Sequence, residues 1–294
     1  MLTLGSYLDD FFCNEKCFLL SQYPGLTINR LKSEIFAIGN YFGIESENLF
    51  DSAYIIATSN PFTQFFEKLK KGIPLEYISG MSYFYQANFF VNSNVLIPRN
   101  ETEILVELAI IEINKKFKNK KCKAIDIGTG SGAIALSILM GSKDVELNFL
   151  ATDISPEALY VAKKNYKLLE FLISKKHTLD FQISDRLNNV IGSFDYIFTN
   201  PPYIKQSDKK SVHDQVLKFE PHLALFLDDE KYDNWFKEFF KSIQSKLNSN
   251  GVCFMEGHED HLEGLHTIAK NLEFNEVQLI KDYTHRNRFL KLTK

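Results

Sequence analysis

Four consecutive residues, Asn200, Pro201, Pro202 and Tyr203, follow directly after an apolar run that reads IFT. Proline fixes its own φ and pushes the residue before it out of the helical region. Two adjacent prolines therefore hold the Asn200 side-chain oxygen and the Pro201 carbonyl oxygen, both hydrogen-bond acceptors, in a rigid arrangement. Two acceptors suit the two N–H donors of a planar NH2 group, on which the Tyr203 ring can stack. This pattern predicts chemistry on an amide or an aromatic amine.

A glycine-rich turn is the second candidate site. The segment KAIDIGTGSGAIAL runs from an apolar strand into a helix, and such glycines permit a tight turn and a close approach of backbone to ligand. The G-x-G-x-G spacing matches neither the dinucleotide fingerprint nor the phosphate-binding P-loop. The turn predicts a nucleoside-containing cofactor without a diphosphate, for which S-adenosylmethionine is the best candidate. The predicted cofactor contacts in this turn are Asp126, Gly128, Thr129, Gly130, Ser131 and Gly132.

Acidic residues at the ends of the next two strands extend this site. Asp153 ends ELNFLATD, and an acid at that position can accept hydrogen bonds from both hydroxyls of a ribose. Asp185 follows the next strand and could contact the adenine amino group. Arg186 comes next, where an apolar or aromatic residue that packs on the base would be easier to explain. The alternative interpretation is a plain tight turn followed by surface acids.

The two sites together indicate a methyl transfer. Ligands of open parallel sheets bind outside the carboxyl ends of the strands, so Asn200 is expected to face the methyl donor. A planar NH2 group is a poor nucleophile because its lone pair is delocalised. Two acceptors that hold its nitrogen against the donor methyl would supply much of the rate by positioning. No general base with a shifted pKa is needed before the transfer.

Alternating strands and helices must position these turns. From residue 120 onward, seven strand-like segments alternate with helical ones, which predicts an α/β fold with a mostly parallel seven-stranded sheet covered on both faces. Only KDYTHRN separates the last two strands, which predicts a closing hairpin at the sheet edge. Asn100 is expected to cap a helix, with Glu103 closing a capping box. Trp235 and the aromatic residues after it are expected in the core.

The chain before this pattern has a different character. Leu31, Ile35, Ile38 and Phe42 recur at helical spacing and predict one apolar helix face in a small helical domain. We predict a helical substrate-binding domain over residues 1–75, a hairpin linker over 76–98 and a catalytic domain over 99–294.

Composition limits the classes of function and the cellular compartment. The 294 residues carry a formal net charge of -3, which argues against a nucleic-acid binder, since such proteins usually have a basic surface. The start of the chain has no basic segment typical of a secretory signal, and no apolar run is long enough to span a membrane. The cysteines, Cys13, Cys17, Cys122 and Cys253, form no CxxC pair and are expected to be buried thiols in a reducing compartment. A cytoplasmic protein is predicted.

The motifs resemble a known family. DIGTGSGAIA and TDISPEAL resemble the cofactor motifs of class I S-adenosylmethionine-dependent methyltransferases, which have a Rossmann-like fold, and NPPY is shared by enzymes that methylate adenine N6 or glutamine N5. PLEYISG, VLIPRNETE, FEPHLAL and DYTHRNRF further resemble the peptide chain release factor N5-glutamine methyltransferases. That resemblance implies methylation of the glutamine in the Gly-Gly-Gln loop of class 1 release factors. It also implies that the turn from Gly128 to Gly132, Asp153 and Asn200 bind the cofactor, and that residues 200–203 bind the glutamine.

The resemblance has departures, and alternatives remain. The family usually has a second proline at the position of Asn100 and an aromatic residue at that of Arg186, and FMEGHED lacks the usual Glu-Ile-Gly order, so Glu256 is given no role. A ribosomal protein glutamine methyltransferase shares NPPY but departs from the PRxETE segment. An adenine-N6 nucleic acid methyltransferase would need phosphate contacts. A non-catalytic binding module would be expected to have lost these motifs. We expect a monomer that acts on a protein, without direct nucleic-acid or membrane contact.

Overall fold

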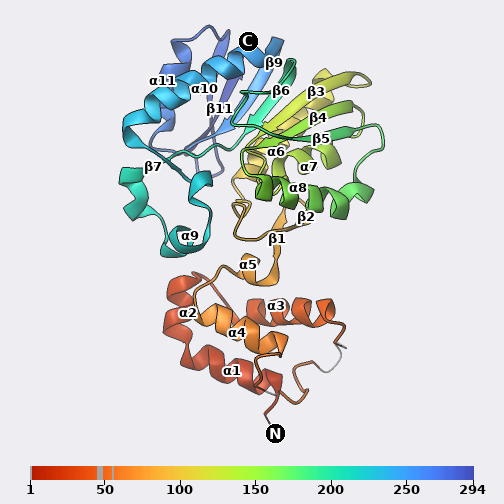
Figure 1. Cartoon of the computed structure of the whole chain (residues 1–294), viewed down its shortest axis with the longest axis vertical. Coiled ribbons are helices and arrows are strands. Elements are labelled where there is room, and N and C mark those ends of the chain that lie inside the picture. The colour runs from red at the N-terminus through yellow and green to blue at the C-terminus, as the bar shows by residue number, and fades with distance from the viewer. Residues whose placement is uncertain (1, 45–48, 55) are drawn as a thin grey trace. The chain divides into compact units, whose positions relative to one another are not determined.

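The computed structural model describes residues 2–44, 49–54 and 56–294, and the chain forms two compact units (Figure 1). The helical unit comprises Met1–Met81 and His213–Phe219, and the sheet unit comprises Ser82–Val212 and Glu220–Lys294. The division differs from the predicted one in two respects, because the hairpin belongs to the sheet unit and a late segment returns to the helical unit. Residues 1, 45–48 and 55 of the predicted helical domain lie outside the described residues.

Short amphipathic helices build the helical unit around an apolar core. Asn60 caps the fourth helix through the Phe62 N–H, and Pro61 occupies its first turn, as the sequence predicts. Leu31 and Ile35 are fully buried, but Phe42 lies beyond the end of its helix and is 58% exposed, so its predicted place on the apolar face is wrong. The helices are α1 (Leu4–Asn14), α2 (Lys16–Gln22), α3 (Ile28–Tyr41), α4 (Pro61–Lys70), α5 (Leu75–Ser79) and α9 (Asp214–Phe219).

A seven-stranded sheet forms the centre of the other unit. Its strand order is β10-β11-β9-β6-β3-β4-β5, and only β11 runs antiparallel to its neighbours. This confirms the predicted mostly parallel sheet with a closing hairpin, β10–β11. The strands are β3 (Lys121–Ile127), β4 (Glu146–Asp153), β5 (Thr178–Ile183), β6 (Phe194–Thr199), β9 (Leu247–Glu256), β10 (Glu276–Lys281) and β11 (Asn287–Thr293).

Helices cover both faces of this sheet, as Figure 1 shows. Strand side chains alternate between the faces, so Tyr196 and Phe198 of β6 pack in one apolar cluster and Ile197 in the other. The first cluster contains α6, α7 and α8, and the second contains α10 and α11. The bounds of these helices are α6 (Thr102–Lys116), α7 (Ala133–Gly141), α8 (Pro156–Leu169), α10 (Tyr232–Lys246) and α11 (Leu262–Lys270).

The predicted hairpin is present, but the predicted capping box is not. The strands β1 (Met81–Phe84) and β2 (Ala87–Phe90) pair around Tyr85 and Gln86, both of which have positive φ. Helix α6 begins at Thr102 without a side-chain cap, because the Glu103 carboxylate accepts from the Tyr85 N–H instead. A smaller pair of strands, β7 (Ile204–Lys205) and β8 (Phe226–Leu227), follows the NPPY segment.

The cysteines correct one further expectation. Cys122 and Cys253 are buried, but Cys13 and Cys17 are exposed thiols on the helical unit. Among the described residues, no three histidine, cysteine or acidic side chains are grouped to hold a metal ion. Nor does any helix in the described ranges have the length and hydrophobicity needed to cross a bilayer.

Candidate active site

A cavity of about 570 Å³ lies within the sheet unit, at the carboxyl ends of adjacent strands. The segments that follow β3, β4, β5 and β6 all contribute to its wall, at the edge where parallel sheets bind ligands. Its volume is in the range of small-molecule sites. The sequence-predicted site residues on this wall are Gly128, Thr129, Gly130, Ser131, Asp153, Asp185, Arg186, Asn200, Pro201 and Pro202.

The glycine turn after β3 forms one side of the cavity. Gly128 and Gly130 have φ values of +71° and +56°, a region that side chains rarely adopt, and a Cβ at either position would meet nothing within 4 Å. Their backbone therefore faces open space that a ligand can occupy. Thr129 and Ser131 lie between and after them, with their side chains almost fully buried.

Asp126 and Gly132 support this turn and do not line the cavity. Asp126 is completely buried and accepts a hydrogen bond from the Thr129 hydroxyl at 2.7 Å. Burial raises the pKa of Asp126 to about 7. A Cβ on Gly132 would lie 3.3 Å from the Ala162 Cβ, so the absence of a side chain lets the turn pack against α8.

Asp153 connects the ends of β3 and β4. One carboxylate oxygen accepts from the Gly130 N–H at 2.9 Å, and the other accepts from the Ser155 N–H at 2.9 Å. Burial raises the pKa of Asp153, while these N–H donors lower it. Each carboxylate oxygen can accept a second hydrogen bond, so the pair of ribose hydroxyls predicted from the sequence suits the remaining acceptor sites.

Asp185 and Arg186 form an ion pair on the cavity wall. The Arg186 Nε and Nη2 atoms lie 3.1 and 3.2 Å from the Asp185 carboxylate oxygens. The guanidinium carbon also lies 5.4 Å from the centre of the Trp235 ring. Trp235 packs against the second apolar cluster, as predicted, but it is only partly buried there and also lines the cavity. A flat guanidinium supported by an indole ring can replace the aromatic residue that the family usually has at this position.

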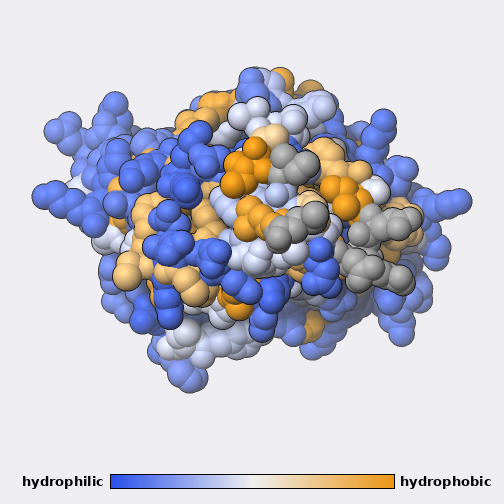
Figure 2. All heavy atoms as spheres, turned by 90° about the horizontal axis from the view of Figure 1, so that it is seen from below, coloured by the Kyte–Doolittle hydropathy of each residue, from blue (hydrophilic) through white to orange (hydrophobic). Residues whose placement is uncertain are grey.

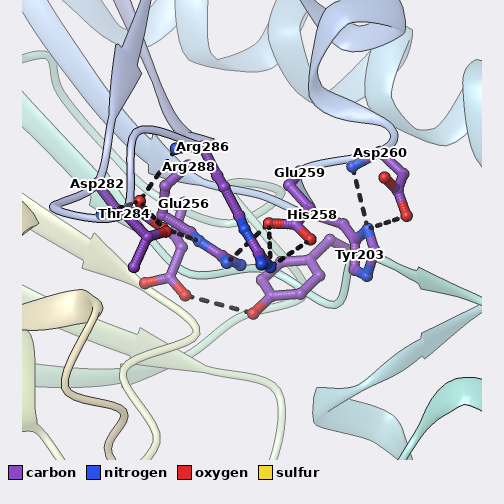
Figure 3. Close-up of polar contacts among 9 residues, drawn as sticks. All are labelled: Tyr203, Glu256, His258, Glu259, Asp260, Asp282, Thr284, Arg286 and Arg288. Atoms are coloured by element: carbon purple, nitrogen blue, oxygen red, sulfur yellow. Dashed lines mark hydrogen bonds and ion pairs between the residues drawn. The ribbon is translucent and has the colours of Figure 1, made fainter.

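The NPPY segment follows β6, the neighbour of β3 in the sheet, and also lines the cavity. Asn200, Pro201 and Pro202 line the cavity, but Tyr203 is not among the lining residues. The Tyr203 hydroxyl instead donates to Glu256 at 3.3 Å, as Figure 3 shows. On the other side of Glu256, the Thr102 hydroxyl donates to its carboxylate at 2.6 Å. Glu256 is almost fully buried and contacts Tyr203 of the predicted substrate turn. No role was predicted for Glu256 from the sequence.

Asn165 of α8 is a second residue that sequence reasoning missed. Its side-chain NH2 donates to the carbonyls of Ser131 at 2.8 Å and Phe90 at 2.9 Å, while its oxygen accepts from the Phe90 N–H at 2.7 Å. The side chain is completely buried and joins the glycine turn to β2. An asparagine on the buried face of an amphipathic helix was the available signal, because buried amides need hydrogen-bond partners.

The motif segments PRNETE and FEPHLAL both contribute to the cavity lining and are joined by an ion pair. Arg99 pairs with Glu220 at 2.6 Å, and the other carboxylate oxygen of Glu220 accepts from the Ile97 N–H at 3.3 Å. The Glu220 side chain is buried while that of Arg99 is partly exposed, and the pair joins two segments that are distant in sequence.

Comparisons with known proteins agree with this geometry. Residues 102–223 match the family described as methyltransferase small domain. A release factor glutamine methyltransferase of Flavobacterium psychrophilum is 37% identical over 76% of this chain and 73% of its own length. One of Leptospira interrogans is also 37% identical, over 76% of each chain. The solved hMettl16 catalytic domain, in complex with MAT2A 3'UTR hairpin 6, shares the fold with a TM-score of 0.50, 17% identity and coverage of 80% of this chain and 81% of its own. The chain therefore belongs to the release factor glutamine methyltransferase family.

Proposed function

We propose that the protein transfers a methyl group from S-adenosylmethionine to the side-chain N5 of the glutamine in the Gly-Gly-Gln loop of class 1 peptide chain release factors. The observation that carries this proposal is the position of Asn200 and Pro201 on the wall of a cavity that also contains the glycine turn and Asp153. The acceptors for a substrate amide thus lie in the same chamber as the groups that suit a nucleoside. Relatives with the same named activity support the choice of substrate.

The groups on the cavity wall suit the parts of S-adenosylmethionine. The open backbone at Gly128 and Gly130 lets a ligand approach closely, and Asp153 offers acceptors for ribose hydroxyls. Arg186 and Trp235 offer a flat surface for the base. S-adenosylmethionine would supply a methyl group on a sulfonium, which is already activated for transfer.

The NPPY segment orients the substrate. The Asn200 side-chain oxygen and the Pro201 carbonyl oxygen accept hydrogen bonds from the two N–H groups of the glutamine amide, which fixes the plane of the NH2 group. Its nitrogen then presents a face to the methyl donor, and positioning lowers the barrier. No group of the protein has to remove a proton before the transfer, since the product nitrogen can lose it afterwards.

The helical unit offers a surface for the protein substrate. Large hydrophobic side chains are exposed on it, and Figure 2 shows hydrophobic side chains among hydrophilic ones on the face seen from below. Such side chains can contact a protein substrate directly, although single exposed apolar residues are also common on protein surfaces. The exposed residues are Leu2, Phe18, Leu20, Phe36, Phe42 and Ile56. We assign this unit to substrate binding, with a monomer working in the cytoplasm.

The test is methylation of defined substrates. The purified protein is incubated with S-adenosylmethionine carrying a labelled methyl group and, separately, with an unmodified class 1 release factor, a ribosomal protein mixture and duplex DNA. Mass spectrometry then locates any added methyl. We expect one methyl on the glutamine of the Gly-Gly-Gln loop, and none when this glutamine is replaced by asparagine in the release factor.

The Asn200→Ala variant tests the role of the NPPY segment in the same assay. It should retain most of its affinity for S-adenosylmethionine through the unchanged glycine turn and Asp153, even though Asn200 is also predicted to contact the cofactor, and it should show little transfer. Methyl on a ribosomal protein or on adenine, with the release factor unmodified, would overturn the choice of substrate. Full transfer by Asn200→Ala would overturn the role of the NPPY segment.

A further inference from the structure

Glu256, at the end of β9, holds hydrogen-bond donors from two other segments. One of its carboxylate oxygens accepts from the Thr102 hydroxyl at 2.6 Å, and the other accepts from the Tyr203 hydroxyl at 3.3 Å. The carboxyl group is 1% exposed, so solvent does not compete for these bonds. Both oxygens therefore act as acceptors, which suits the ionised form of the group.

The direction of the Thr102 bond limits what Asn200 can do. A threonine hydroxyl has one proton, and here that proton is directed to Glu256, so toward any other neighbour the oxygen can only accept. The neighbour is the Asn200 side chain, whose Nδ2 lies 3.5 Å from the Thr102 oxygen, at the long end of the hydrogen-bond range. Asn200 must then turn its NH2 group to Thr102 and its carbonyl oxygen the other way.

We propose that Glu256 and Thr102 are positioning residues that fix the Asn200 amide with its carbonyl oxygen available to the substrate. This inference rests on the proposed function, in which that oxygen accepts an N–H of the substrate amide. A flipped Asn200 would place an NH2 group opposite the substrate NH2, and two donors would face each other. Because the two ends of an asparagine amide have nearly the same shape, packing alone cannot choose between these orientations.

Arg288 offsets part of the effect of burial on the pKa of Glu256. Arg288 of β11 lies beside Glu256 and is itself held by Asp282 at 3.5 Å and Glu259 at 3.6 Å (Figure 3). Burial raises the pKa of Glu256, and the nearby Glu101 raises it further, whereas Thr102, Arg288 and Tyr203 lower it. The DYTHRNRF segment thus contributes to this site, since Asp282 holds Arg288, and Arg288 lowers the pKa of Glu256.

Substitutions at Thr102 test the chain of bonds. Thr102→Val keeps the shape and removes the hydroxyl, and we expect kcat to fall by roughly tenfold to a hundredfold, the usual effect of a misplaced catalytic group. The Kd for S-adenosylmethionine should change less than about twofold, which is about 0.4 kcal/mol. Thr102→Ser restores the hydroxyl and should recover most of kcat. Thr267→Val, which removes a threonine hydroxyl bonded within α11 and away from the cavity, is the matched control.

A second measurement reads the amide orientation without any turnover. In protein labelled with 15N-asparagine, the Asn200 side-chain NH2 signals are identified by their loss in Asn200→Asp. The wild-type protein should show nuclear Overhauser contacts from these protons to the Thr102 methyl group. Absence of those contacts would overturn the inference, as would an unchanged kcat in a folded Thr102→Val. Contacts present in a protein that methylates no release factor would refute the proposed function and leave the orientation intact.

Discussion

Replacing Asn165 by alanine tests how the cofactor turn is held. Its side chain satisfies three backbone groups, the N–H and carbonyl of Phe90 and the carbonyl of Ser131, at distances of 2.7, 2.9 and 2.8 Å. Alanine leaves all three without this partner, at a site that is buried at Ser131 and partly buried at Phe90. An unsatisfied buried group costs about 1–3 kcal/mol, and the carbonyls recover part of the loss through their second lone pairs. The lower bound for each group gives a loss of roughly 3 kcal/mol in the free energy of unfolding.

The same change should weaken cofactor binding. Ser131 lines the cavity, so a turn that loses the Asn165 bond becomes less ordered before the ligand arrives. If about 1 kcal/mol of this cost is recovered only on binding, the Kd for S-adenosylmethionine rises roughly fivefold. Asn189→Ala changes an exposed asparagine of the same unit and should alter neither quantity.

The assay is urea unfolding followed by tryptophan fluorescence, with ligand titration on the same samples. Trp235 is the chain's one tryptophan and lines the cavity, so its signal reports on the sheet unit. The reasoning would be refuted if Asn165→Ala unfolded within about 0.5 kcal/mol of the wild type, the range of ordinary surface substitutions. A large loss of stability with an unchanged Kd would refute only the link between Asn165 and the cofactor turn.

Three further predictions concern the cavity. Gly130→Ala adds a methyl group that faces the open cavity at positive φ, so it should raise the Kd for S-adenosylmethionine. Gly192→Ala has the same kind of backbone strain outside the cavity and should leave this Kd unchanged. Calorimetric titration compares the two variants. Burial raises the pKa of Glu256, and only the ionised carboxylate accepts from both Thr102 and Tyr203. The kcat should therefore rise with pH through a pKa above the usual glutamate range. A pH profile of kcat without this rise contradicts the role of Glu256. Arg186→Ala should raise the same Kd by roughly fivefold, about 1 kcal/mol of stacking, while Arg186→Lys, which keeps the charge but not the plane, should recover little.

Much of the fold could be predicted because its signals are local. Alternating strands and helices determine a parallel sheet, and glycines at the exit of its first strand indicate a turn open to a ligand. The capping box at Glu103 failed for the opposite reason. A local pattern predicted a bond to its own helix start, but the Tyr85 N–H, 18 residues away in sequence, took the carboxylate. Local propensity cannot indicate such a competitor.

The supporting residues of the site could not be predicted from spacing. Thr102 and Glu256 are separated by 154 residues, and Asn165 and Phe90 by 75, so no periodicity connects them. Thr102 and Glu256 are also ordinary residue types for their elements when each is considered alone. What distinguishes Glu256 is complete burial beside two hydroxyl donors, and burial of a charged group depends on the packed structure.

The distant motifs that resemble the family become one arrangement in the folded chain. Thr102 comes from the PRNETE segment, Arg288 from DYTHRNRF, and both act on Glu256, which in turn holds Tyr203 of NPPY. A substrate amide needs an acceptor, and the Asn200 amide can be that acceptor in only one of two orientations. Reversing the Asn200 amide costs little free energy unless its neighbour Thr102 can only accept a hydrogen bond. The motifs act together because Glu256 takes the hydroxyl proton of Thr102, so Thr102 can only accept a hydrogen bond from the NH2 group of Asn200.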